Sequence, residues 1–157
     1  IAPPLVERAT IFHITGAAAY DDVAKHAPEH INYEIVPFIS TGMAPIMGAA
    51  DIVVSRAGAT AMQELAMLAK PVIMVPNPYL TSGHQLKNAR VYEQANAALT
   101  VGEEALQKNP LVLLRAIDSL LDDPARTIAM GKALGDFARP RAAAQTAELI
   151  TQQVKSK

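Results

Sequence analysis

The sequence has no cysteine and no tryptophan, and aromatic residues make up only 4% of its 157 positions. Without cysteine the chain can form no disulfide, no thiolate nucleophile and no cysteine-ligated zinc site. The formal net charge is −1, so the chain offers no basic field of the kind that holds a nucleic-acid backbone. No apolar run approaches the roughly 18 residues of a membrane span, and no signal-type segment opens the chain. These absences exclude disulfide scaffolds and thiol enzymes, and they indicate that nucleic acid is not a partner.

The residues that are present describe a folded, alanine-rich chain. Half of them are hydrophobic and the mean hydropathy is +0.15, which excludes a disordered chain. The length fits one domain, residues 1–157, with a hydrophobic core. Alanine occurs 29 times and is the best helix former, so we expect helices with close, small-residue packing.

Short β-rich runs alternate with longer helical patterns along the chain. Strands are expected at residues 9–15, 31–36, 51–55, 71–76 and 97–101. Helices are expected at residues 17–27, 41–50, 59–69 and 83–96, followed only by helices at 111–121, 124–137 and 141–154. The apolar centres of the third and fourth strands indicate burial on both faces. This alternation predicts an α/β fold, with a Rossmann-like parallel sheet flanked by helices and C-terminal helices from about residue 110 onward.

The loop after the third expected strand is the most informative, because ligands bind at the carboxyl ends of parallel strands. Ser55 ends the strand, Gly58 permits a tight turn, and a helix begins at once. The free N–H groups and positive dipole end of such a helix suit a diphosphate. Glu64, about one turn into the helix, would then reach ribose hydroxyls. One glycine is a weak signal, and the spacing alone also fits Gly58 serving only the turn and Glu64 only complementing the dipole.

Two further loops and one histidine have both a binding and a structural interpretation. After the fourth strand, His84, Gln85 and Asn88 begin a helix, and they either contact a sugar or nucleotide or belong to a solvated capping segment. After the second strand, Phe38 either forms a flat slot for a base or belongs to the core. His13 lies within a strand, where histidine is more often structural than catalytic.

Several nucleotide and metal motifs are absent. The sequence has no Gly-x-Gly-x-x-Gly, no Walker-type phosphate loop, no Asp-x-Asp pair and no close histidine spacing for zinc. The nucleophile elbow Gly-x-Ser-x-Gly is also missing. We therefore expect a diphosphate nucleotide held by helix dipoles and neutral groups, with no metal and no cofactor.

These loops, taken in order, resemble one family. The carrying segments are residues 50–60 (Ala-Asp-Ile-Val-Val-Ser-Arg-Ala-Gly-Ala-Thr), 64–66 (Glu-Leu-Ala), 70–76 (Lys-Pro-Val-Ile-Met-Val-Pro) and 83–89 (Gly-His-Gln-Leu-Lys-Asn-Ala). Residues 12–16 and 36–39 also fit, so the likeness covers about residues 9–138. The chain is similar to the C-terminal, donor-binding domain of the MurG-type UDP-N-acetylglucosamine transferases, glycosyltransferase family 28.

The resemblance implies one half of a GT-B enzyme that transfers N-acetylglucosamine, with inversion, from its UDP donor to undecaprenyl-diphosphate-muramyl-pentapeptide in peptidoglycan synthesis. It places the backbone of Ile39 at uracil, Glu64 at the ribose and Gln85 at the sugar. No residue of this chain is implied as catalytic. The full set of residues implied in UDP-N-acetylglucosamine binding is Phe38, Ile39, Met43, Arg56, Gly58, Ala59, Thr60, Ala61, Met62, Gln63, Glu64, His84, Gln85 and Asn88.

The chain departs from the family pattern in two places. The family's domain opens with a strand, a Gly-Gly-Ser-x-Gly-Ala loop and a helix, and nothing like that loop occurs here. The acceptor domain is missing too, and the chain starts at Ile1 rather than Met, so we expect a piece of a longer protein without its first βα unit. The piece alone is expected to be inactive. The lipid-linked acceptor and peripheral attachment to the inner face of the cell membrane are expected to involve the missing half of a cytoplasmic enzyme.

Three alternatives to this function stay open on the sequence. One is another GT-B enzyme, such as a glycolipid glycosyltransferase with the same donor loops. Another is a separate, non-catalytic donor-binding subunit of a two-part transferase. The third is a flavodoxin-like binding module without a preference for uridine nucleotides.

Overall fold

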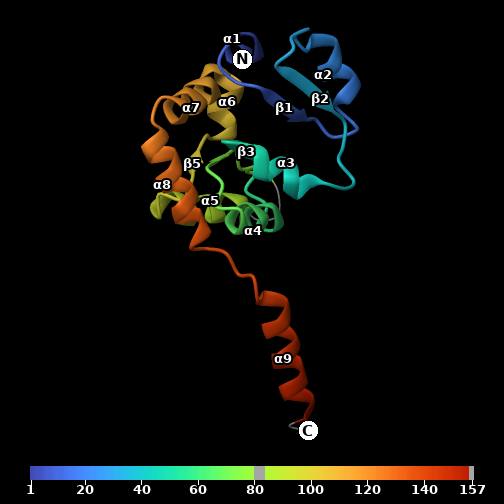
Figure 1. Cartoon of the computed structure of the whole chain (residues 1–157), viewed down its shortest axis with the longest axis vertical. Helices are drawn as coiled ribbons and strands as arrows, with labels where there is room; N and C mark the ends of the chain where they lie inside the picture. The colour runs from blue at the N-terminus through green and yellow to red at the C-terminus, as the bar shows by residue number, and fades with distance from the viewer. Residues whose placement is uncertain (80–83, 156–157) are drawn as a thin grey trace.

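The computed structural model describes residues 1–79 and 84–155, with helices and strands alternating up to residue 100 (Figure 1). The strands are β1 (Ile11–Ile14), β2 (Tyr33–Val36), β3 (Val53–Ser55), β4 (Val72–Met74) and β5 (Leu99–Thr100). The helices are α1 (Ala2–Val6), α2 (Tyr20–His26), α3 (Met43–Ala49), α4 (Ala59–Met67), α5 (His84–Gln94), α6 (Glu103–Lys108), α7 (Leu111–Leu121), α8 (Pro124–Gly135) and α9 (Ala142–Lys155). All five expected strands and seven expected helices are present, while α1 and α6 were not expected.

The strands form two parallel sheets rather than the single sheet that the sequence predicts. β1 pairs with β2, and a separate sheet has the order β3-β4-β5. Among the described residues no strand pairing joins β1 to β3, so the two sheets are not continuous. The expected parallel arrangement flanked by helices is present, but the strands are divided between two sheets because no described strand pairs with both β1 and β3.

β1 and β3 each have one edge without a partner among the described strands. Ile11 N–H donates to Asn32 O at 2.7 Å, so alternation along a parallel strand directs the amides of Phe12 and Ile14 away from β2. In the same way Val53 N–H donates to Pro71 O at 2.9 Å, which directs the Val54 amide away from β4.

The side chains of Phe12, Ile14 and Val54 are 39%, 36% and 44% exposed. The expectation that the third strand is buried on both faces was therefore wrong, because the face of β3 that carries Val54 is exposed.

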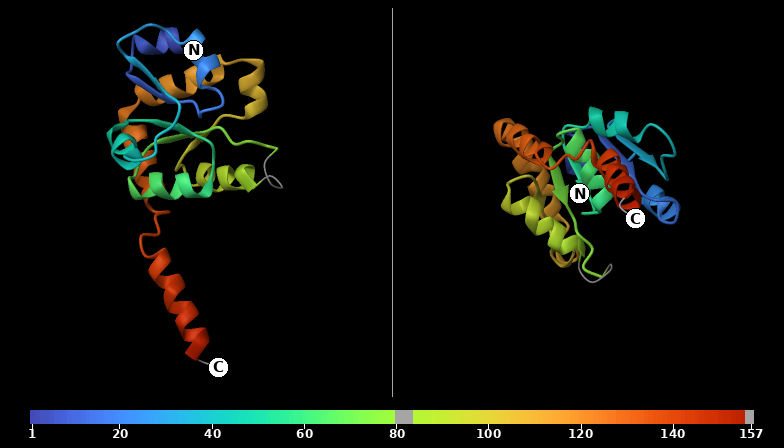
Figure 2. Two further views of the ribbon diagram at one scale, coloured as in Figure 1. Left: turned by 90° about the vertical axis from the view of Figure 1, so that its right-hand side faces the viewer. Right: turned by 90° about the horizontal axis from the view of Figure 1, so that it is seen from below.

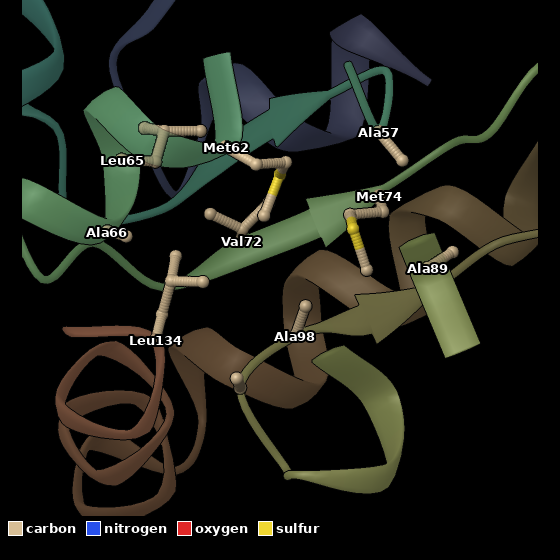
Figure 3. Close-up of a cluster of buried hydrophobic side chains, with 10 residues drawn as sticks. Ala57, Met62, Leu65, Ala66, Val72, Met74, Ala89, Ala98 and Leu134 are labelled. Carbon is tan, nitrogen blue, oxygen red and sulfur yellow. The ribbon is translucent and has the colours of Figure 1, made fainter. Parts of the chain in front are cut away.

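β4 lies at the centre of the larger sheet and is fully buried, as its sequence indicates. Its side chains alternate between two hydrophobic clusters. On one face Val72 and Met74 pack with Met62 and Leu65 of α4 and with Leu134 of α8 (Figure 3). The other face is filled by a second cluster, made of Leu5, Ile73, Val75, Val101, Ile117, Leu120 and Met130.

Small residues allow α8 to approach the end of α4 closely. Gly131 of α8 is buried, and a Cβ there would collide with the backbone oxygen of Ala69 and lie 3.2 Å from Pro71 Cδ. Ala69 itself has a left-handed φ of 49°. At the start of α8, Asp123 Oδ1 accepts a hydrogen bond of 2.9 Å from Arg126 N–H, and Pro124 is the first helical residue.

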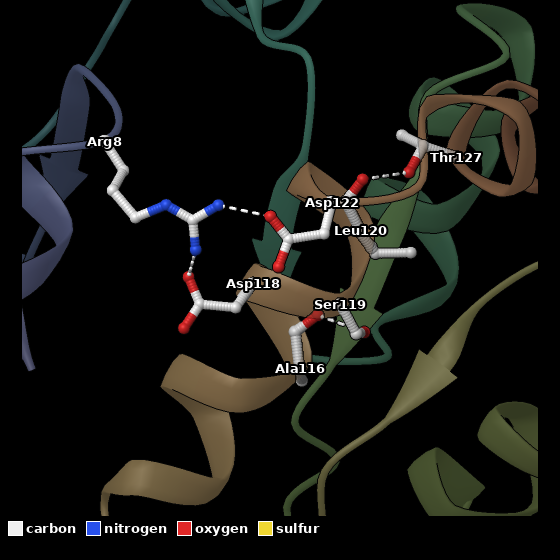
Figure 4. Close-up of polar contacts among 7 residues, drawn as sticks. All are labelled: Arg8, Ala116, Asp118, Ser119, Leu120, Asp122 and Thr127. Carbon is white, nitrogen blue, oxygen red and sulfur yellow. Dashed lines mark hydrogen bonds and ion pairs between the residues drawn. The ribbon is translucent and has the colours of Figure 1, made fainter.

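Ion pairs and a hydrogen bond join the segments that lead into the β1-β2 sheet to the rest of the molecule. Arg8, which precedes β1, bonds to Asp118 of α7 and to Asp122 directly after that helix (Figure 4). Asn32, which precedes β2, donates from Nδ2 to Val6 O at 2.9 Å. Within this sheet His13 Nδ1 lies 2.7 Å from the Tyr33 hydroxyl, with the two rings edge to face.

The last helix, α9, projects away from the body of the molecule (Figures 1 and 2). Its described side chains are all exposed, including Leu149, Ile150 and Val154. Within residues 1–79 and 84–155, no helix has the length and apolar character needed to cross a membrane.

Replacing Gly131 with alanine is expected to destabilise the fold by about 1–3 kcal/mol, because the new methyl group must displace the Ala69 backbone. Gly48→Ala in α3 is the matched control, since no heavy atom lies within 4 Å of the point where its Cβ would stand and alanine favours a helix. Chemical denaturation of the two variants measures the difference. Equal stability of the two would show that α8 does not pack against Ala69 as described.

His13→Gln is expected to flatten the pH dependence of stability below neutral pH. Burial lowers the pKa of His13 from its ordinary value of 6.5, so the folded state binds its proton less readily than the unfolded chain. Stability is therefore complete above about pH 6.5 and declines as the pH falls toward the folded pKa. Unfolding free energies measured from about pH 7 to pH 5 test this, and an unchanged slope in the variant would contradict it.

Candidate nucleotide-binding site

The loops that follow β3, β4 and β5 lie at the carboxyl edge of the larger sheet, because these strands are parallel neighbours. This edge is where open parallel sheets bind ligands. Most of the residues that the sequence predicts for the site come from the first two of these loops and from the helices that follow them, α4 and α5.

The start of α4 has backbone donors without a side-chain cap. Gly58 is the N-cap residue and makes no capping bond, and Ala59 and Thr60 after it are exposed while Ala61 is half-buried. The φ of Gly58 is −75°, which any residue adopts, so the turn itself does not require glycine. The helix start therefore presents free N–H groups and the positive end of the dipole at an uncovered surface.

Further along α4 the side chains of the predicted residues lie in different surroundings. Glu64 is exposed. Gln63 donates from Nε2 to Phe137 O at 3.3 Å, which turns its side chain toward the end of α8. Met62 is fully buried, and its N–H bonds to Gly58 O at 3.0 Å, so neither its side chain nor its amide is available to a ligand here.

Arg56, in the loop after β3, is paired with a residue that is not among those predicted from the sequence. Its Nη1 lies 2.8 Å from Glu103 Oε2, and its Nη2 donates to Glu103 Oε1 at 3.3 Å. Glu103 is the first residue of α6, directly after the loop that follows β5. The signal available in the sequence was an acidic residue just past a strand end, at the same edge as the other loops.

The loop after β4 is tied to the start of α5. Gln85 Oε1 accepts a 2.8 Å bond from Asn77 N–H, and Asn77 Oδ1 accepts another of 2.8 Å from Tyr79 N–H. Asn88 is half-buried one turn later. Residues 80–83 and the side chain of His84 lie outside the described part of the structure, so the structure does not place the histidine contact expected there.

The loop after β2 belongs to the smaller sheet. Phe38 is 72% exposed, so the alternative that it is a core residue was wrong. Ile39 and Met43 are half-buried, and Met43 begins α3 after Gly42, whose φ of 86° explains the glycine. The predicted base-binding residues therefore come from a different sheet from Arg56 and α4.

In the part of the chain that the structure describes, no group of three or more acidic or histidine side chains could hold a metal ion. A hollow of about 760 Å³ lies at the opposite end of the strands, lined among others by Ile52, Pro71, Leu120 and Ile128. None of the predicted site residues lines this hollow.

The chain resembles curated transferases over most of its own length. It is 38% identical over 155 residues to the UDP-N-acetylglucosamine--N-acetylmuramyl-(pentapeptide) pyrophosphoryl-undecaprenol N-acetylglucosamine transferase of Gloeobacter violaceus, covering 98% of this chain and 43% of the relative. It is 36% identical over 150 residues to the transferase of the same name from Listeria monocytogenes, covering 92% and 40%. The chain therefore spans about two-fifths of the length of these relatives.

Solved structures give the same fold. The crystal structure of Acinetobacter baumannii MurG superposes with a TM-score of 0.78 at 27% identity, covering 90% of this chain and 41% of that one. The glycosyltransferase VinC, solved with dTDP, has a TM-score of 0.66 at 19% identity over 82% of this chain and 30% of that one, a likeness of fold alone. The expected Rossmann-like half of a GT-B enzyme is thus confirmed. The family model described as the glycosyltransferase family 28 C-terminal domain matches residues 2–152, and the chain belongs to that family.

Proposed function

We propose that this chain is the donor-binding part of an inverting hexosyltransferase that moves N-acetylglucosamine from UDP-N-acetylglucosamine to undecaprenyl-diphosphate-muramyl-pentapeptide, a step of peptidoglycan synthesis. The uncapped start of α4, in a chain of this family, is the observation that carries the proposal. The names of the curated relatives supply the donor and the acceptor.

The start of α4 would bind the diphosphate. The N–H groups of Ala59, Thr60 and Ala61 belong to the first helical turn, and the dipole adds a positive partial charge there. Because Gly58 has no side chain, a phosphate can approach the backbone closely. As the bond from sugar to phosphate breaks, negative charge grows on the departing UDP, and these fixed dipoles stabilise it.

The remaining predicted residues would arrange the nucleoside and the sugar around this point. Exposed Glu64 would accept hydrogen bonds from the ribose hydroxyls, and exposed Phe38 would lie beside the base. Gln85, held at Asn77, would offer its amide group to the sugar. Ile39, Met43, Arg56, His84 and Asn88 complete the proposed contact set, whereas burial of Met62 and the bond from Gln63 to Phe137 support leaving these two out.

We further propose that a missing βα unit belongs between β1 and β3. Insertion of one parallel strand there would give the single sheet order β2-β1-new-β3-β4-β5. Two observations support it: the amides of Phe12, Ile14 and Val54 point away from their partner strands, and the same three side chains are exposed. Without that unit the donor contacts are incomplete, so the chain alone would not catalyse the transfer. The acceptor and attachment to the cytoplasmic membrane face would involve polypeptide beyond these 157 residues.

Hydrogen exchange tests the missing strand. The amides of Phe12, Ile14 and Val54 are expected to exchange fast in this chain, and slowly when it is extended by the segment that precedes the matched region of the Gloeobacter violaceus relative. The amides of Ile11 and Val53, already bonded to neighbouring segments, serve as controls and stay protected in both forms. Slow exchange of the first three in the unextended chain would show that these edges are already paired.

Replacing Glu64 with alanine is expected to weaken donor binding by about 1–3 kcal/mol in the intact enzyme, because the ribose hydroxyls lose their acceptor. Glu93→Ala removes an exposed carboxylate from α5 and is the control. Titration of UDP-N-acetylglucosamine, with UDP-glucose and UDP-galactose alongside, measures the loss and the sugar preference. Unchanged donor affinity in Glu64→Ala would mean that the ribose assignment is wrong, and a preference for another sugar would favour a glycolipid enzyme.

A further inference from the structure

We propose that Glu103 is a counter-ion that competes with the nucleotide diphosphate for Arg56 and so limits how tightly the departing nucleotide is held. This inference rests on the proposed function, because it assumes a diphosphate at the start of α4. It assigns a role to a residue outside the predicted site.

The geometry joins two loops of the same sheet edge. Arg56 follows β3 and Glu103 follows β5, so the pair reaches across the carboxyl end of β4, which lies between these strands. Both terminal nitrogens of the guanidinium face the carboxylate, at 2.8 Å and 3.3 Å. The charge of Arg56 is thus already neutralised by the protein itself.

Arg56 is the cation best placed to meet a diphosphate. It is the only basic residue between Ser55 and Glu64, and it stands two positions before the N-cap glycine of α4. Its side chain is 47% exposed, so it can be reached from solvent. A guanidinium pairs with phosphate oxygens in the same forked geometry that it uses for a carboxylate.

The pair is poorly suited to a purely structural role. Ion pairs with one partner in solvent contribute little to stability. The Glu103 carboxylate is only 19% exposed, and its Oε2 makes no well-oriented hydrogen bond although Arg56 Nη1 is close. The Thr100 hydroxyl, three residues earlier, is likewise buried without a partner among the described residues. This edge therefore retains unused polar groups around the arginine.

The consequence is a balance between binding and release. The nucleotide diphosphate carries more negative charge after transfer than the donor did, so an unopposed arginine would favour retention of the product. A nearby carboxylate that pairs again with the guanidinium weakens the binding of the product. Glu103 thus tunes the affinity for phosphate groups while leaving the nucleoside contacts untouched.

The test compares Glu103→Gln, which keeps the shape of the side chain, with Glu104→Gln, its exposed neighbour paired to Lys108. UDP and uridine are titrated into each protein at low salt and followed by nuclear magnetic resonance. Glu103→Gln is expected to bind UDP about three- to tenfold more tightly and uridine equally, with a smaller gain at high salt. Glu104→Gln, which removes the same charge, should stay within about twofold of the parent.

A double-mutant cycle with Arg56→Gln completes the test, because the gain in UDP affinity caused by Glu103→Gln must vanish when the arginine is absent. In the parent chain the Arg56 side-chain resonance should shift with UDP and not with uridine, a readout that needs no variant. A gain that persists without Arg56, or unchanged or weaker UDP binding in Glu103→Gln, overturns the counter-ion role alone. If UDP binds no better than uridine even to the chain extended by the preceding segment, the proposed donor site itself is wrong.

Discussion

Burial of β4 on both faces is the constraint on which the rest of the larger sheet depends. Val72, Ile73, Met74 and Val75 are each at most 5% exposed, and a large aliphatic side chain gains about 1.5–3 kcal/mol on such burial. Both faces must then be covered, which requires α4 and α8 on one side and α7 on the other. Because β3 and β5 pair with this strand, its burial also determines where the loops after β3 and β5 begin. The relative positions of α4, Gln85 and Glu103 therefore follow from the burial of β4.

The smaller sheet is held by different means. Neither β1 nor β2 contains a fully buried residue. The links of this sheet to the body include the buried Leu5 and Val6 of α1, the packing of Ile11 against the second cluster, and the polar contacts of Arg8 and Asn32. Exposed ion pairs contribute little to stability, so this unit depends less on its own core than on its neighbours. A strand between the two sheets would supply that core. The same insertion would bring the loop after β2, with Phe38, into one sheet with α4.

The sequence predicts well what local chemistry decides. The apolar run of β4 was confirmed as a buried strand and a helix begins at Pro124 as expected, because each depends on neighbours along the chain. The break between the sheets was missed because strand pairing is a long-range choice. Glu103 was missed for the same reason, since its bond to Arg56 joins positions 47 residues apart. The residues from Gly58 to Glu64 could be proposed from the sequence because they lie on one loop and one helix.

The electrostatics of the proposed site would suit a ligand that must be released. The dipole of α4 contributes about half a positive charge, which favours a diphosphate without fixing it. A full arginine charge beside it would strengthen binding of the more highly charged product most, which would slow its release. Pairing Arg56 with Glu103 would weaken that attraction while keeping the guanidinium within reach. The proposed site, built from backbone donors and one compensated cation, would therefore suit transfer better than a strongly basic pocket.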